Sequence, residues 1–397
     1  MRKLLFIFLK ILKKTRQIRL KMCGITEDEV HQQRIVSGKA WDEFCDQLKL
    51  AGASLIFPGA PRDPFQQAEG VRYLTRLTRA GLEAFVEYND PAFPVLRQMV
   101  HETVKMGADN PDNVYLNAQI SGQYEYMITG KRNSIDYIGF FTQNGNYSTT
   151  GGLAPCGKLD NSELSCEADG GFEIILSKTP KGKNWLKIED TTSLVIVRQT
   201  FLDRSSEIPA EVSISNLDGR KAPDPVSPAK IDEGLKTASM FVAGASLLFA
   251  RWAKGFQKHT NKLPQFDPEV SDAAGGDKSI IYYHSHWKLA PLEVLIIEAK
   301  PPDCDTWNFQ LNNYWMESLD YRFFNVCINK ASAVPEEDGS LKVIVSHTDP
   351  GHPNWIDTCG HAEGTMCWRW YRLKNGAEPV EPACRVLKLN DLGSEKR

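Results

Sequence analysis

The chain has 397 residues, of which 42% are hydrophobic and 24% charged, an ordinary globular composition with ample material for a core. Its net charge of −3 hides an asymmetry, because residues 1–21 hold eight Lys or Arg and no acid, whereas the remainder carries 39 bases and 50 acids. An acidic body argues against a nucleic-acid-binding surface, which needs a basic stripe. Nine cysteines without a C-x-x-C pair argue against a zinc finger and favour free thiols in a reducing, intracellular compartment.

Residues 1–21 form a basic amphipathic segment. Its longest uncharged run, Leu4 to Leu9, is far shorter than the roughly 20 residues that a membrane-spanning helix needs. At helical spacing the apolar residues share one arc and the lysines lie opposite. The segment therefore predicts either an interfacial helix on an anionic membrane or an organelle-targeting presequence, with an unstructured extension as the alternative.

Residues 39–110 are expected to be helical. Apolar residues recur at helical spacing over 40–50 and over 67–88, with a Pro/Gly-rich break between the two runs. Asp90-Pro91 is expected to begin a further helix, because proline suits the first turn.

From residue 113 the hydrophobic period changes to two, which indicates a first β block over 113–220 and a second over 280–390. The predicted strand runs are 114–120, 124–129, 135–141, 172–176, 193–200, 211–215, 280–287, 293–299, 306–311, 324–329, 341–346, 367–371 and 386–389. Many short strands with polar turns are typical of a β-sandwich or jelly-roll-like body.

A long helix is expected between the β blocks, within residues 229–262. Its centre, Ala238 to Ala250, is apolar nearly all round but too short to span a bilayer, so it is interpreted as a buried helix or a lid. The predicted fold class is α+β: a sandwich-like β body, an N-terminal helical region and one long inserted helix.

The segment from His347 to His361 has the most unusual composition, with three histidines, two aspartates, two prolines and two glycines in fifteen residues. A plain surface loop needs Gly, Pro and polar residues but not clustered imidazoles, so we interpret it as a functional loop. Asp357 lies four residues before His361, and a carboxylate beside an imidazole suits general acid/base catalysis. Stapling of the loop to the sheet is the alternative.

The strand from Trp307 places Asn308 and Gln310 on one face, next to Trp315 and Glu317. A row of amides beside a tryptophan predicts the lining of a polar-ligand pocket, with a solvated outer face as the alternative.

Arg369 alternates with two tryptophans and therefore points away from both. It is predicted to pair a buried carboxylate or to clamp an anionic ligand.

A divalent metal is an open alternative, although no cofactor is predicted. The ligand types that suit zinc are present, but the prolines leave the loop's geometry undetermined and the pair His284 and His286 is a weak signal. The loop's candidate ligands are His347, Asp349, His352, Asp357 and His361. The nucleophile motif G-x-S-x-G and Gly-rich phosphate loops are absent from the sequence, which argues against serine hydrolases, kinases and Rossmann dehydrogenases.

These residues resemble the domain of unknown function 1214 family. The similarity is carried by Trp307-Asn-Phe-Gln-Leu, Trp315-x-Glu-Ser-Leu-Asp-Tyr-Arg, the segment from His347 to His361, and Arg369-Trp370. The resemblance implies a β-sandwich fold and no agreed reaction. His352 departs from the family pattern, so the preferred set becomes Asp349, Asn354, Trp355, Asp357, His361 and Arg369.

Two functions follow from these patterns. One is a metal-independent acid/base enzyme of hydrolase or lyase type acting on a polar or lipid-like small molecule, with His361, Asp357 and Arg369 as catalytic residues. The alternative is a non-catalytic β-sandwich protein that binds a carbohydrate- or lipid-like ligand at the periphery of a membrane. The expected ligand-contacting residues are Asn308, Gln310, Trp315, Glu317, Asp349, Asn354 and Trp355.

Overall fold

The computed structural model describes residues 15, 22–145, 154–273 and 276–396. The basic segment 1–21 lies, apart from Thr15, outside the described residues. The α-helices are α2 (Glu27–Val36), α3 (Lys39–Ala51), α4 (Pro64–Leu82), α5 (Pro228–Phe256) and α6 (Pro268–Ala273). The 3-10 helices are η1 (Gly52–Ile56), η3 (Gln257–His259) and η4 (Leu389–Lys396), and η2 (Glu83–Glu87) is a π-helix.

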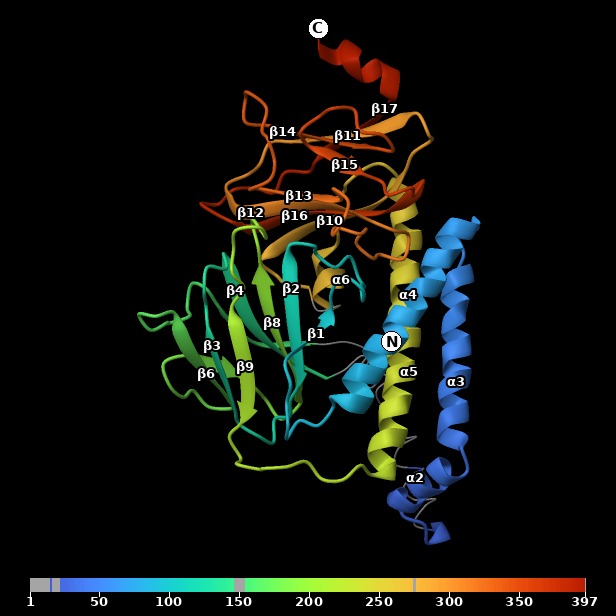
Figure 1. Ribbon diagram of the computed structural model, residues 1–397, viewed down its shortest axis with the longest axis vertical. Helices are drawn as coiled ribbons and strands as arrows, with labels where there is room; N and C mark the ends of the chain where they lie inside the picture. Colours follow the sequence, from blue (N-terminus) through green and yellow to red (C-terminus); the bar gives the residue numbers. More distant parts are fainter. Residues whose placement is uncertain (1–14, 16–21, 146–153, 274–275, 397) are drawn as a thin grey trace.

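Helices α3, α4 and α5 form a layer along one flank of the molecule (Figure 1). Local signals start two of them: Asp63 caps α4 ahead of Pro64, and Ser227 caps α5 ahead of Pro228. Apolar side chains of α4 and α5 form one core cluster, and those of α3 and α5 form another. Among the described residues, no helix is long and apolar enough to cross a membrane.

The first β block consists of two sheets packed face to face. One sheet has the order β1-β2-β8-β4-β5 and the other the order β7-β6-β3-β9. Inward side chains from both sheets form a single core cluster. The strands are β1 (Arg97–Val100), β2 (Asn113–Gln119), β3 (Tyr126–Lys131), β4 (Tyr137–Asn144), β5 (Ala154–Asp160), β6 (Gly171–Ser177), β7 (Trp185–Lys187), β8 (Thr192–Thr200) and β9 (Glu211–Asn216).

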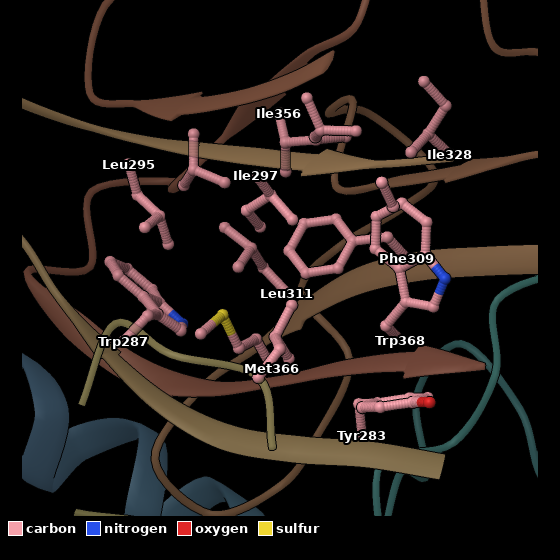
Figure 2. Packing of buried hydrophobic residues seen from close by; sticks show 14 of the residues in the cluster. Tyr283, Trp287, Leu295, Ile297, Phe309, Leu311, Ile328, Ile356, Met366 and Trp368 are labelled. Carbon is pink, nitrogen blue, oxygen red and sulfur yellow. The ribbon is translucent and has the colours of Figure 1, made fainter. Parts of the chain in front are cut away.

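The second β block is built in the same way. Its sheets have the orders β10-β16-β12-β13 and β15-β14-β11-β17. Figure 2 shows Phe309, Leu311 and Trp368 of one sheet facing Leu295, Ile297 and Ile356 of the other. The strands are β10 (Ile280–Lys288), β11 (Glu293–Ala299), β12 (Cys304–Asn312), β13 (Cys327–Asn329), β14 (Leu341–Ser346), β15 (Trp355–Asp357), β16 (Glu363–Leu373) and β17 (Ala383–Lys388).

The two β blocks repeat one topology. Strands β2 to β9 correspond in chain order to β10 to β17, because β2-β8-β4-β5 matches β10-β16-β12-β13 and β7-β6-β3-β9 matches β15-β14-β11-β17. The strand directions also agree: β6 pairs β7 in parallel, as β14 pairs β15, and the remaining pairs are antiparallel in both. The fold is therefore a duplicated unit, with α5 inserted between the copies.

The predicted α+β class, N-terminal helical region and long inserted helix are confirmed. The helix expected to begin at Asp90-Pro91 is wrong: Asp90 accepts a hydrogen bond from Ala92 N in a turn, and residues 97–100 pair as β1 with β2. Strand pairing overrides the local preference for a helix start at Pro91. The strands β1, β5, β7 and β15 fall outside the predicted runs.

Candidate functional site

Asn354 and Trp355 hold the functional loop of the sequence analysis to its sheet. The Asn354 amide donates to the carbonyls of Val334 and Lys342 and accepts from Val334 N, at 2.7, 3.0 and 2.8 Å. Trp355 Nε1 donates to the carbonyl of Ser346. Asn354 is fully buried, and its side-chain hydrogen bonds all go to the backbone of neighbouring loops and strands.

The first β block contains the same arrangement. Asn184 donates to the carbonyls of Ser165 and Glu173 and accepts from Ser165 N, while Trp185 Nε1 donates to the carbonyl of Ser177. The sequence carries a matching signal, Ser177-x-Thr with Asn184-Trp185 against Ser346-x-Thr with Asn354-Trp355. The Asn-Trp pair is therefore a repeated structural feature of the fold. It stabilises the connection from β6 to β7 in the first block and from β14 to β15 in the second.

In the segment from His347 to His361, the His361 imidazole and the Asp357 and Asp349 carboxylates contact separate partners. His361 Nδ1 lies 3.2 Å from Gln66 Oε1 of α4, and its ring packs on Phe65. The Asp357 and Asp349 carboxylates each accept from a backbone N–H two residues ahead, at 2.8 Å. Burial lowers the pKa of His361 to about 4, so the imidazole is neutral at neutral pH. Among the described residues, no hydrogen bond joins His361 to Asp357.

The structure does bring Asn308, Gln310 and Arg369 together. Arg369 lies on β16 opposite Asn308 of β12, and its guanidinium donates to Gln310 Oε1 at 2.6 Å. The space in front of this face is filled by the protein's own chain: Arg369 donates to Ala108 O and Gln310 donates to Asp109 O. All three side chains are buried. They bind the segment that leads from the helical layer into the first β block.

Glu317 and Trp315 anchor helix α4. Glu317 forms an ion pair with Arg76 at 2.6 Å and accepts from Asn313 at 2.8 Å. Trp315 Nε1 donates to the carbonyl of Gln66 at 3.2 Å. Both side chains are buried at the junction between the helical layer and the second β block.

A groove of about 1080 Å³ lies between α2, α3 and α5 and contains none of the predicted site residues. Its wall carries an imidazole–carboxylate pair, His31 Nδ1 at 2.7 Å from Asp232 Oδ2. Arg34 donates to both oxygens of Asp232 and also to Glu43. Burial acts to raise the pKa of Asp232, but hydrogen bonds from Arg34 and His31 outweigh it and leave that pKa below its ordinary value.

Local sequence explains this geometry. Thr26 and Glu29 form a capping box that starts α2, and His31 and Arg34 follow three apart on one face of the helix. Asp232 lies in the second turn of α5, where it faces His31 and Arg34 of α2. Local sequence patterns do not reveal this pair, because α2 has little apolar periodicity and because Asp232 is 201 residues away from His31 in the chain.

Three or more His, Cys, Asp or Glu side chains do not gather in a metal-binding arrangement anywhere among the described residues. The predicted alternatives at His347 and His352 have other partners. His347 hydrogen-bonds Thr358 and the carbonyl of Leu289, and His352 lies 3.8 Å from Glu336.

The architecture defines an α+β protein with a duplicated two-sheet unit. A model of the family described as "Protein of unknown function (DUF1214)" matches residues 294–375. The crystal structure of an uncharacterised protein from Burkholderia cenocepacia is 48% identical, with a TM-score of 0.88 over 91% of this chain and 99% of that one. The chain therefore belongs to the DUF1214 family.

A second solved structure, the VPA0106 protein from Vibrio parahaemolyticus, is 11% identical, with a TM-score of 0.46 over 86% of this chain and 100% of that one. Comparison with curated proteins finds no match.

Proposed function

We propose that the protein is an acid/base enzyme of hydrolase or lyase type, independent of a metal, whose active site is the α2–α3–α5 groove. The observation that supports this proposal is the His31–Asp232 hydrogen bond on the groove wall. When Nδ1–H donates to a carboxylate, the tautomer is set and Nε2 carries the lone pair that accepts a proton, from the attacking water in a hydrolase or from the substrate in a lyase.

The groove also indicates the class of substrate. Its charged lining contains more carboxylates than cations, so a neutral or cationic polar molecule is favoured over an anion. The carboxylates are Glu27, Glu43, Asp46, Asp232 and Glu233, and the cations are Arg34, Lys39 and Lys236.

A non-catalytic binding protein is the second candidate. The observation in its favour is that Asp232 already accepts from Arg34 at 2.8 and 3.0 Å, so the cluster also serves as an ion-pair network that joins α2 to α5. In this case the groove binds the polar molecule without converting it.

The catalytic roles of His361, Asp357 and Arg369 stay predictions. Their hydrogen-bond partners lie within the fold, and the α2–α3–α5 groove is a separate place. A test of the groove therefore uses His361 as its comparison.

The experiment measures turnover of neutral carboxylic esters and lactones by the wild type, His31→Gln and His361→Gln. We expect His31→Gln to lower kcat by about 10²–10⁴-fold, the usual contribution of a general base, and His361→Gln to change it less than about threefold. The melting temperature is recorded for each variant to separate catalysis from folding.

Three outcomes are informative. Loss of turnover in His361→Gln at unchanged melting temperature would move the active site to the 347–361 segment. Binding of a panel compound that depends on His31 but leaves the compound unchanged would establish the second candidate. Full activity of His31→Gln would refute the enzyme proposal for the groove.

A further inference from the structure

A second hollow, of about 500 Å³, lies at the opposite end of α5 from the groove. Arg251, Lys254 and Lys258 line it together with Gly255, Gln257 and Phe57. Residues 251, 254, 255 and 258 follow the i, i+3, i+4, i+7 spacing that places side chains on one face of a helix. Arg251 and Lys254 of α5 and Lys258 of the following segment η3 therefore line a single hollow, which we call the basic pocket.

No acidic side chain in the lining of the basic pocket neutralises its positive charge. Its lining contains no carboxylate, although the chain beyond residue 21 carries 50 acids against 39 bases. Within the described part of the chain, Arg251 and Lys258 form no ion pair or hydrogen bond, and Lys254 donates only to Gln257 at 3.2 Å. All three cations are exposed, so they are available to a ligand.

Stabilisation of the helix explains only part of this cluster of positive charges. A cation in the last turn of a helix interacts favourably with the helix dipole, which suits Lys254 and Lys258. Arg251 lies before the last turn of α5, which ends at Phe256, and gains little from the dipole. Lys254 and Lys258 are also four apart, a spacing at which like charges repel.

The wall of the pocket opposite the helix is held in place by the close approach of the Gly59 backbone to Lys254 and Gln257. Gly59 adopts φ +93°, and a Cβ there would lie 2.5 Å from Gln257 Oε1 and 2.6 Å from Lys254 Cδ. Gln257 in turn donates to the carbonyl of Gly59 at 2.8 Å. The positive φ favours glycine at this turn, and Phe57, two residues earlier, lines the pocket together with the three cations.

We propose that the basic pocket binds a phosphate-bearing anion, either free or as the headgroup of an anionic lipid. Three formal positive charges outweigh the roughly half negative charge at the end of α5. Arg251 supplies a planar fork for two phosphate oxygens, and the lysines supply point charges. The exposed Ile56, next to Phe57, places an apolar side chain beside the pocket, as a membrane surface would require.

The test uses the full-length protein and two double variants. In Arg251→Gln/Lys258→Gln the pocket loses two charges, whereas Lys221→Gln/Lys300→Gln removes two charges from exposed lysines elsewhere. Binding of tripolyphosphate is measured by calorimetry at low and moderate salt. We expect the wild type and the control to bind tripolyphosphate alike. The pocket variant should bind it at least about tenfold more weakly, because electrostatic attraction to the pocket, which salt screens, supplies most of the affinity.

Vesicles distinguish the two sources of phosphate. Sedimentation with phosphatidylcholine vesicles, with and without phosphatidic acid, is repeated for the chain lacking residues 1–21. Binding to acidic vesicles that survives the truncation but is lost in the pocket variant assigns a lipid headgroup. Binding of tripolyphosphate without pocket-dependent binding of vesicles assigns a free phosphate compound. The proposal is overturned if the pocket variant matches the control with both probes, or if the wild type binds neither.

Discussion

At the residue scale, the asparagine of the Asn-Trp pair makes the same contacts in both copies of the fold. Asn354 lies in the segment with the most unusual composition in the chain, yet its side chain satisfies three backbone groups of the second β block. Asn184 makes the same three contacts in the first block, where no histidine-rich segment exists. A residue used identically in both copies is explained by the topology that the copies share.

Replacing either asparagine tests this explanation. Asn354→Ala and Asn184→Ala should each lower the free energy of unfolding by about 2–4 kcal/mol, because each leaves buried backbone groups without partners. Urea unfolding of both variants provides the measurement, and each is the matched control for the other. A large loss of activity in Asn354→Ala without loss of stability would instead point to a ligand contact.

The buried imidazole of His361 makes a prediction about pH. Its pKa is about 4 in the folded protein against 6.5 in the unfolded chain, so the unfolded state binds this proton at higher pH. The stability gained from a neutral His361 is fully present above pH 6.5 and is lost as pH falls toward 4, by up to about 3 kcal/mol.

His361→Gln should therefore flatten the dependence of stability on pH. Between pH 6.5 and 4 the slope for the wild type should exceed that for the variant by up to about 1.4 kcal/mol per pH unit, the value for one proton. Urea unfolding at several pH values measures both slopes. Equal slopes would show that His361 titrates normally in the folded state. Burial also lowers the pKa of His284, to about 3, so both proteins should still lose stability in acid.

At the element scale, buried charges decide how the helical layer attaches to the second β block. Arg76 of α4 and Glu317 after β12 form an ion pair that is shielded from solvent. Such a pair is costly to break at one end, because the remaining charge stays buried. The ion pair therefore specifies where α4 docks more than it adds net stability.

A double variant separates the cost of an unpaired buried charge from the net stability that the ion pair adds. Arg76→Met should lower the free energy of unfolding by about 3–5 kcal/mol, since Glu317, whose pKa burial already raises, must then stay charged without a partner or take up a proton. Adding Glu317→Gln should recover part of the loss, because the amide still bonds Asn313 without a charge. Equilibrium unfolding of the two single variants and the double variant gives the coupling energy. A double variant less stable than Arg76→Met alone would argue against an uncompensated charge as the cause.

At the scale of the whole molecule, the two β blocks are copies of one topology, and α5 joins them. The helix carries the two features that we assign to ligands at its opposite ends, Asp232 in the acid-rich groove and Arg251 in the basic pocket. Asn308 and Gln310 of the second β block bind the segment at 108–110, which leads into the first block, and their role in ligand binding stays a prediction. Charge, in addition to apolar burial, organises the places where the parts of the chain meet.

Much of the fold could be read from the sequence. Alternating residues located most of the strands, and the apolar stretch from Ala238 to Ala250 marked α5, because local periodicity reports which side of an element is buried. Four strands were missed, and two of them, β7 and β15, have three residues each, too few to show a period. The repeat was also missed, although Asn184-Trp185 and Asn354-Trp355 mark it.

By itself the sequence determined the α+β class, the order of helices and β blocks, the acidic body with its basic first segment, and the family resemblance later shown by comparison. Only the tertiary structure decided which polar residues meet. His31 and Asp232 come together and His361 and Asp357 make separate contacts, because pairing between distant segments depends on how helices and sheets pack. Local spacing records the face of an element but not what that face will touch.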